Sequence, residues 1–312
     1  MEPTYMSECA SLARVRAWES SEGASIVGER ATKETEMAWE LLDWAGKAAM
    51  QASGAEARTT DGRHVYSMVG RGALSPMILL HGVGASALSW ARIARSLLRE
   101  AGRIWMPDLP GHGFSGAPGR WTLDGLFEDL ERQLTREISE PVVLVGHSLG
   151  AMMAVRFTVR HPELVRRLVL VTPAGGTVAE GAWRRVRPDF EVKTNADARA
   201  LLDRMLSDPS WTSRLLAPYL RETYARPSVR ALVDSVRVSD MLTASELRRV
   251  RPPTLLLWGG RERLLPASDL EHFRAHLPGS AEIEVIEGWG HGVVLDRPGE
   301  VARRIVDFAS RG

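Results

Sequence analysis

Val145-Gly146-His147-Ser148-Leu149-Gly150 is the stretch that decides the fold of this chain. Residues 141–145 in front of the serine are continuously apolar, as in a strand that is buried on both faces of a sheet. Residues 151–155 behind it are compatible with a helix and contain no helix breaker. Glycines lie two positions before and two positions after Ser148, and such a G-x-S-x-G pattern lets a strand turn sharply into a helix with the hydroxyl exposed. The sequence therefore makes Ser148 a candidate nucleophile.

The composition is that of a globular protein with a sizeable core. The chain has 312 residues, of which 44% are apolar and 25% are charged, and this balance excludes disorder of the whole chain. Its length favours one large domain with an added subdomain. Forty basic and thirty-nine acidic residues leave a formal charge of +1. We therefore expect neither a nucleic acid nor an anionic membrane surface as partner.

The single cysteine and the lack of long apolar runs bear on the compartment. Cys9 has no second cysteine to pair with, which excludes an intrachain disulfide and a cysteine-based metal cluster. Charged residues interrupt the first 22 positions, so no signal peptide is expected. No apolar run reaches 18 residues, so no transmembrane helix is expected either. The sequence thus favours a cytoplasmic protein.

Residues 1–54 differ from the rest of the chain, because strand patterns are absent from them. Met37, Leu41, Trp44 and Ala48 follow helical spacing and form an apolar stripe. We therefore expect an N-terminal helical extension over residues 1–54. The stripe could pack on the main domain, which is the simpler interpretation, or it could contact a membrane surface or a partner protein.

From residue 55 onward, short strand patterns alternate with helical ones. Asp61-Gly62 between two strand-like runs predicts a hairpin. Alternation of this kind indicates a mostly parallel sheet with helices on both faces. The alternation stops between residues 174 and 247, where only helical patterns occur. We expect an α/β core of residues 55–173 and 248–312, with a helical cap formed by residues 174–247.

A serine hydroxyl needs a neighbouring base, and that base needs an acid to orient it. Two residues that follow Ser148 in the chain can meet these needs. Glu262 comes directly after the apolar run at residues 254–258, and His291 lies in a glycine-rich loop after the last strand pattern. The order serine, acid, histidine is the order found in α/β-hydrolases.

Residues 58–310 resemble the α/β-hydrolase superfamily in four blocks that occur in the expected order. The blocks are His81-Gly82-Val83-Gly84, Asp108-Leu109-Pro110-Gly111-His112-Gly113-Phe114-Ser115, Gly146-His147-Ser148-Leu149-Gly150 and Gly290-His291. Residues 172–175 and 258–259 are also similar to monoacylglycerol-lipase-like members and to related bacterial lipases and esterases. The resemblance implies an α/β-hydrolase fold with an eight-stranded, mostly parallel sheet and a helical cap.

The chain departs from the superfamily pattern at the acid. Glu262 occupies the position where the superfamily most often has Asp, and the longer carboxylate occurs in known variants of the triad. A surface charge beside two arginines is the structural alternative for Glu262. Asp269 and Asp296 are then the other candidate acids, although Asp269 is better explained as a helix N-cap and Asp296 precedes a helix that begins with proline.

Two backbone N–H groups should bind the oxyanion that forms when Ser148 attacks a carbonyl. Leu149 supplies one of them, because it directly follows the nucleophile, and the resemblance assigns the other to Val83. Four other polar side chains near these motifs are expected to be structural. They are His81, which would brace the loop after its strand, His147, which would point away from Ser148, and the pair Asp108 and His112, which would stabilise a turn.

These features predict a serine hydrolase that cleaves the carboxylic ester of a small molecule through an acyl-enzyme, with Ser148, Glu262 and His291 as triad. The cap contains leucines, Met205 and tryptophans, so an apolar substrate is expected, although such residues can also form the core of the cap itself. A thioester, lactone or carbon–carbon bond hydrolase would use the same residues, and a ligand-binding or accessory protein could retain them. No motif calls for a metal or a nucleotide, so no cofactor is expected.

Overall fold

The computed structural model describes residues 46–208 and 211–311. Residues 47–312 form one compact unit, and the description below concerns this unit. Three members of the N-terminal apolar stripe, Met37, Leu41 and Trp44, lie outside the described residues. Ala48 lies in a helix whose described residues are 46–52, and Met50 of this helix is buried against the sheet core.

A single eight-stranded sheet organises the unit, in the order β1-β2-β4-β3-β5-β6-β7-β8. The first two pairs in this order, β1 with β2 and β2 with β4, are antiparallel, and all later pairs are parallel. The strands are β1 Glu56–Thr60, β2 Arg63–Val69, β3 Met77–Leu80, β4 Arg103–Pro107, β5 Val142–His147, β6 Val165–Val171, β7 Thr254–Gly259 and β8 Glu282–Ile286. The mostly parallel eight-stranded sheet expected from the sequence is thereby confirmed.

The turn between β1 and β2 is the predicted hairpin. Asp61 and Gly62 have φ angles of 51° and 72°, the left-handed pair that a two-residue type I′ turn requires. Glycine adopts this conformation without steric cost, and aspartate is among the residues that tolerate it.

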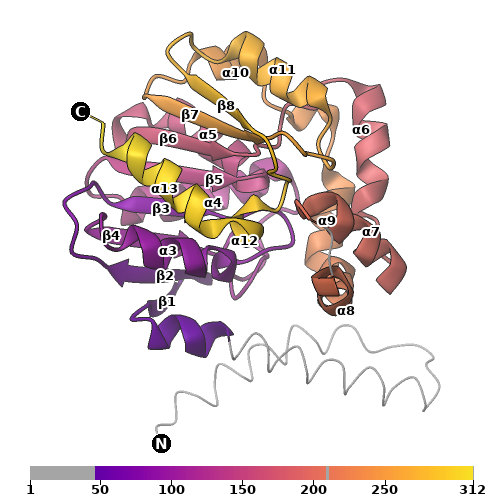
Figure 1. Cartoon of the computed structure of the whole chain (residues 1–312), viewed down its shortest axis with the longest axis horizontal. Helices are drawn as coiled ribbons and strands as arrows, with labels where there is room; N and C mark the ends of the chain where they lie inside the picture. Colours follow the sequence, from indigo (N-terminus) through magenta and orange to yellow (C-terminus); the bar gives the residue numbers. More distant parts are fainter. Residues whose placement is uncertain (1–45, 209–210, 312) are drawn as a thin grey trace, which may run out of the picture. The chain divides into compact units, whose positions relative to one another are not determined.

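The central strands are apolar at every position because both faces of the sheet are covered. In β5, Val142 and Leu144 join one buried cluster, while Val143 and Val145 join the other. Helices α4 Leu123–Glu137, α5 Leu149–Arg160, α10 Ala244–Arg248 and α11 Ala267–His276 contribute to the first cluster. Helices α3 Ala91–Leu97, α12 Val293–Asp296 and α13 Pro298–Ala309 contribute to the second and cover the face turned toward the viewer (Figure 1).

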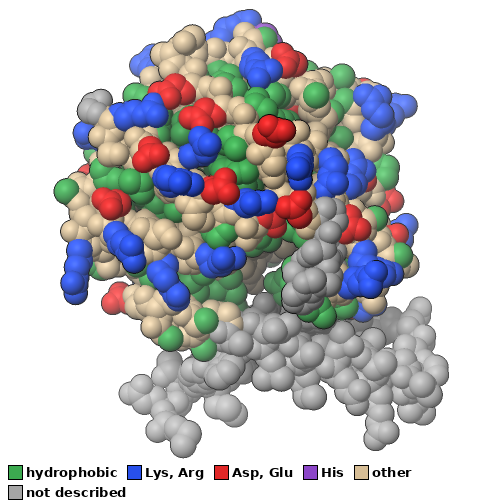
Figure 2. Space-filling model, viewed as in Figure 1, with side chains coloured by type: hydrophobic (Ala, Val, Ile, Leu, Met, Phe, Trp, Pro, Cys, Tyr) green, Lys and Arg blue, Asp and Glu red, His purple; other side chains and the backbone are tan. Residues whose placement is uncertain are grey.

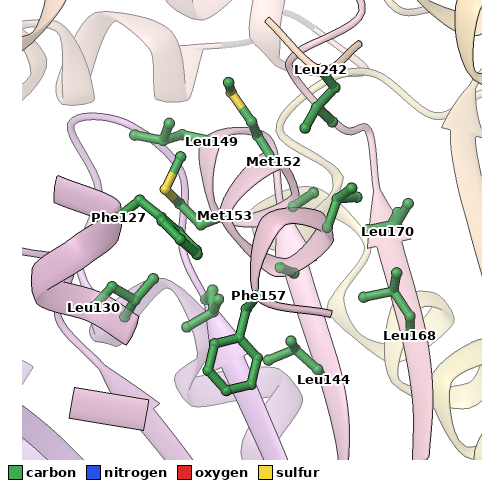
Figure 3. Close-up of a cluster of buried hydrophobic side chains, with 14 of the residues drawn as sticks. Phe127, Leu130, Leu144, Leu149, Met152, Met153, Phe157, Leu168, Leu170 and Leu242 are labelled. Carbon is green, nitrogen blue, oxygen red and sulfur yellow. The ribbon is translucent and has the colours of Figure 1, made fainter. Parts of the chain in front are cut away.

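Helix α5, which follows Ser148, is fixed by apolar contacts on several sides. Met153 and Phe157 lie between Phe127 of α4 and Leu168 of β6 (Figure 3). Phe157 is fully buried, and burial of a side chain of this size stabilises the fold by roughly 1.5–3 kcal/mol. The start of α5, and with it Ser148, is therefore held firmly against the sheet.

Between β6 and β7 the described residues form helices and turns but no strand, and we refer to this stretch below as the helical insertion. Its helices are α6 Glu180–Val186, α7 Asn195–Met205, α8 Trp211–Ala225, α9 Pro227–Ser235 and α10, with short 3₁₀ turns between some of them. A separate buried cluster that includes Leu201, Leu202 and Val229 joins α7, α8 and α9. Many apolar residues of the insertion thus form its own core.

The start of α7 is set by a capping box. Thr194 accepts a hydrogen bond from the Asp197 N–H, and Asp197 accepts one from the Thr194 N–H. Each of these bonds satisfies a backbone group that the helix leaves unpaired at its end. The helix runs from this cap to Met205, after which Leu206 is extended, and the chain then passes the loop that carries His291.

Basic and acidic side chains are interspersed on the face shown in Figure 2. Ion pairs connect α13 and the segment after it to strand β8, with Arg304 bound to Glu284 and Arg311 bound to Glu282. Among the described helices, none combines the length and the apolar character needed to cross a bilayer.

Candidate active site

Ser148 lies on a strained turn between β5 and α5, with φ 51° and ψ −118°. Two close approaches explain the flanking glycines. A Cβ atom at Gly150 would lie 2.3 Å from the Leu80 carbonyl oxygen, and one at Gly146 would lie 2.4 Å from the Cα atom of Ala151. Strain of this kind persists only where the surroundings enforce it and is typical of functional sites. The geometry matches the sharp strand-to-helix turn that the motif predicts.

The structure brings Ser148, His291 and Glu262 together in one line of hydrogen bonds. His291 Nε2 lies 3.0 Å from Ser148 Oγ, and His291 Nδ1 lies 2.8 Å from Glu262 Oε2. Ser148 and His291 are 143 positions apart in the sequence. They meet because β5, β7 and β8 are parallel, so the loops after these strands emerge at the same edge of the sheet.

Glu262 is a buried carboxylate with several hydrogen-bond donors. Its Oε1 atom accepts hydrogen bonds from the N–H groups of Leu264 at 2.8 Å and Leu265 at 3.0 Å. Burial favours the neutral acid, but the charge that His291 can carry and the hydrogen bonds to the carboxylate outweigh this effect. The pKa of Glu262 is therefore lowered below its ordinary value, and the group is an anion at neutral pH.

Neither of the two other candidate acids contacts His291. Asp296 accepts a hydrogen bond of 2.7 Å from the Ser207 N–H. Asp269 accepts one of 2.6 Å from the Thr177 hydroxyl, and burial raises its pKa to about 7. The expectation that Asp269 caps a helix was wrong, since the N-cap of α11 is Pro266 and Asp269 lies inside the first turn. Its side chain turns instead toward the loop that begins the insertion.

The remaining histidines of the motifs have structural contacts. His147 Nε2 lies 2.8 Å from the carbonyl oxygen of His291, and burial together with the neighbouring His291 lowers the pKa of His147 to about 3. His81 Nε2 accepts a hydrogen bond of 3.0 Å from the Leu109 N–H, so it joins the loops after β3 and β4. His112 Nδ1 lies 3.1 Å from the Pro110 carbonyl oxygen within its own turn.

Asp108 stabilises two turns, as the sequence suggested. Its carboxylate accepts hydrogen bonds from the N–H groups of Ala87 at 2.7 Å and Phe114 at 2.9 Å. A Cβ atom at Gly113 would lie 2.4 Å or less from the atoms of this carboxylate. Asp108 thus fixes the start of the 3₁₀ turn Ala87–Trp90, which follows the loop at residues 82–85.

The loop at residues 82–85 lies directly beside the candidate nucleophile. A Cβ atom built on Gly82 would be 3.2 Å from the Cβ atom of Ser148. Val83 follows Gly82 and lines a cavity together with Ser148. Leu149 is the first residue of α5, and the first N–H groups of a helix have no partner inside the helix.

A cavity of about 50 Å³ adjoins Ser148 and His291. Its walls come from the loop after β3, from the helical insertion, and from the segments after β7 and β8. The apolar lining residues include Val83, Phe190, Met205, Leu264, Val294 and Leu295. Met205 of the insertion lines the cavity, whereas Trp183 of the insertion is not part of its lining.

Two contacts that the sequence did not indicate join the insertion to the loop of His291. The Gly290 N–H donates a hydrogen bond of 2.9 Å to Ser207 Oγ, and the Gly292 N–H donates one of 2.6 Å to the Met205 carbonyl. No local signal marks Ser207, because its partner lies 83 positions away. Within the described part of the chain, no group of three or more His, Cys, Asp or Glu residues could hold a metal ion.

The sequence model of the alpha/beta hydrolase family matches residues 77–304, which include all three residues of the hydrogen-bonded line. This match extends over well more than half of the chain. The chain therefore belongs to the alpha/beta hydrolase family.

Curated relatives and solved structures connect the chain to lipases and esterases. It is 27% identical over 253 residues to the mouse sn-1-specific diacylglycerol lipase ABHD11, covering 77% of this chain and 82% of that protein. It is 24% identical over 249 residues to the pimeloyl-(acyl-carrier protein) methyl ester esterase of Vibrio cholerae, covering 75% and 94%. The carboxylesterase CesB of Bacillus subtilis has the same fold, with a TM-score of 0.70, 21% identity and coverage of 87% and 98%.

Proposed function

We propose that this protein is a serine hydrolase that cleaves a carboxylic ester through an acyl-enzyme, with Ser148 as nucleophile, His291 as base and Glu262 as acid. The observation that carries the proposal is the unbroken line of hydrogen bonds from Ser148 Oγ through His291 to Glu262, at 3.0 Å and 2.8 Å. Both distances are within the range that proton transfer between such groups requires.

In the first half of the reaction, Ser148 Oγ attacks the ester carbonyl carbon while His291 Nε2 removes the hydroxyl proton. The Glu262 carboxylate accepts the Nδ1 hydrogen of His291, which fixes the tautomer and balances the charge of the imidazolium. The imidazolium then donates its proton to the departing alkoxide, and the acyl group stays bound to Ser148. In the second half, His291 Nε2 removes a proton from water, which attacks the acyl carbon. The bond from this carbon to Ser148 Oγ then breaks, His291 returns the proton to Oγ, and the acid is released.

The tetrahedral intermediate of each half carries a negative oxygen. We assign its two donors to the N–H groups of Val83 and Leu149. Leu149 is at the start of α5, where the helix dipole favours negative charge, and Val83 belongs to the loop that adjoins Ser148. Removal of one such donor in other enzymes typically lowers kcat by about 100-fold or more.

The substrate we propose is a small ester with an apolar acyl part, covered by residues 174–247 acting as a cap. The apolar walls of the cavity support this assignment, because three of them, Phe190, Met205 and Tyr224, come from the helical insertion. Apolar walls beside the nucleophile favour transfer of an apolar group from water into the site.

Release of p-nitrophenol from short and medium acyl esters tests the proposal. The wild type should turn over, whereas Ser148→Ala and Glu262→Ala should each lose nearly all activity. A fluorophosphonate probe should label the wild type at Ser148 and should not label Ser148→Ala. Loss of activity in Ser148→Ala alone would move the acid to another residue.

The alternatives predict other outcomes of the same experiment. A hydrolase for a thioester, a lactone or a carbon–carbon bond would be labelled by the probe but would turn over the simple esters poorly. A binding or accessory protein would bind ligands and show no turnover with any of these classes, even if the probe labelled Ser148.

A further inference from the structure

Tyr224 of helix α8 is the polar side chain of the cavity whose hydroxyl has no partner among the described residues. The other polar side chains that line the cavity are engaged. Ser89 Oγ donates a hydrogen bond of 2.8 Å to the Ser86 carbonyl. His147 is bound to the His291 carbonyl, and Ser148 and His291 are bound to each other. The Tyr224 hydroxyl has no such hydrogen bond to the residues that the structure describes.

Two neighbours, Phe190 and Gly84, restrict the ring of Tyr224. The Phe190 ring is stacked on it with centroids 6.3 Å apart and planes inclined by 23°. Gly84 also adjoins the ring, since an added Cβ atom there would lie 2.8 Å from Tyr224 Cε2 and 3.3 Å from its hydroxyl oxygen. Gly84 directly follows Val83, to which we assign one of the oxyanion donors. The hydroxyl therefore lies beside the loop at residues 82–85, which contains Val83.

The environment makes this hydroxyl a donor rather than an ionisable group. Tyr224 is 3% exposed, and burial raises the pKa of its phenol. A buried tyrosine hydroxyl usually has a hydrogen-bond partner, because leaving it unpaired costs free energy. Because the other polar side chains of the cavity are already hydrogen-bonded, a bound substrate can supply the missing acceptor.

We propose that the Tyr224 hydroxyl donates a hydrogen bond to an acceptor oxygen in the acyl part of the substrate, close to the ester carbonyl, so that the enzyme prefers alkoxy- or oxo-substituted acyl esters to plain aliphatic ones. This inference rests on the proposed esterase function. The acyl part is the one concerned, because it stays attached to Ser148 through both halves of the reaction.

Two p-nitrophenyl esters of nearly equal size test the preference. In p-nitrophenyl methoxyacetate an ether oxygen replaces one methylene of p-nitrophenyl butyrate. The quantity to measure is kcat/KM for the methoxyacetate divided by kcat/KM for the butyrate. This ratio is compared between the wild type and Tyr224→Phe. This comparison cancels the difference in chemical reactivity between the esters. We expect Tyr224→Phe to lower the ratio by about 3- to 10-fold, the size of one hydrogen bond.

Tyr219→Phe is the matched control, since it makes the same chemical change on the same helix outside the cavity lining, and its ratio should equal that of the wild type. Equal losses on both esters in Tyr224→Phe would overturn the proposal and assign the hydroxyl to the shared transition state. Unchanged kinetics on both esters would overturn it as well. Failure of the esterase function itself would look different, because the wild type would then hydrolyse neither ester or Ser148→Ala would remain active.

Discussion

The N–H of Gly290 donates its hydrogen bond to the hydroxyl of Ser207, so a residue of the helical insertion fixes the loop that carries His291. Both groups are buried, and the distance is 2.9 Å. The position of the candidate base therefore depends on a part of the chain that lies outside the α/β core.

Ser207→Ala tests this dependence. The substitution leaves the Gly290 N–H buried without its partner, which should cost about 1–3 kcal/mol of folding free energy. We expect kcat to fall several-fold with little change in KM, because the His291 loop becomes less well positioned. Steady-state kinetics and urea unfolding measure the two effects. Ser310→Ala is the control, because it removes an exposed hydroxyl that is bonded to the Val306 carbonyl. It should change neither kcat nor the free energy of unfolding. An unaltered kcat in Ser207→Ala would contradict the positioning role.

Glu262→Gln keeps the size of the side chain and removes its negative charge. The variant should lower kcat by about 100- to 10,000-fold, because the imidazolium of His291 loses its counter-charge and its fixed tautomer. Asp296→Asn provides the comparison, since Asp296 contacts Ser207 and not His291. We expect kcat of Asp296→Asn to fall by less than about 10-fold, because the charge beside His291 is retained. A larger loss in Asp296→Asn than in Glu262→Gln would reassign the acid.

Asp269 should make stability depend on pH. Burial raises its pKa from 3.8 to about 7 in the folded chain. Between these pH values the folded state retains a proton that the unfolded state releases, so this contribution to stability is present at low pH and is lost as pH rises to about 7. Asp269→Asn mimics the protonated form. It should have nearly wild-type stability at pH 4 and be more stable than wild type by about 2–4 kcal/mol at pH 8.

Denaturant unfolding at both pH values measures this difference. Asp203→Asn, on an exposed position of α7, should show no comparable gain at pH 8. If Asp269→Asn is less stable than wild type at both pH values, the carboxylate is ionised in the folded protein and the assignment fails.

Gly150→Ala tests how tightly the start of α5 is packed. The added methyl group would lie 2.3 Å from the Leu80 carbonyl oxygen and 2.5 Å from that of His81, so the helix must shift. We expect a loss of about 1–3 kcal/mol or more, together with loss of labelling by the fluorophosphonate probe. Gly279→Ala introduces the same methyl group where no atom lies within 4 Å, and its melting temperature should stay near that of the wild type.

The local patterns of the sequence, together with the resemblance to the α/β-hydrolase superfamily, were sufficient to predict the sheet and the candidate triad. Apolar runs such as residues 142–145 predicted strands covered on both faces, and the glycines around Ser148 predicted a sharp turn. Glu262 and His291 could be predicted because each follows a strand pattern, and parallel strands bring their following loops to one edge.

Contacts between distant segments could not be predicted in the same way. Ser207 and Tyr224 carry no motif, and their importance arises only from the way the helical insertion folds back on the core. Asp269 illustrates the opposite error, because its position near a helix start suggested a cap. Its actual partner, Thr177, lies 92 positions earlier in the chain.

Strand β8 forms one edge of the sheet, and its residues are exposed or only partly buried. His291 follows this strand, whereas Ser148 follows β5 in the interior of the sheet. Edge elements with few buried contacts open at lower free energy than the global unfolding reaction. Mild denaturant should therefore abolish ester hydrolysis while the tryptophan fluorescence of the folded core persists. Loss of activity would then detect local opening at this edge of the sheet at denaturant concentrations that leave the rest of the fold intact.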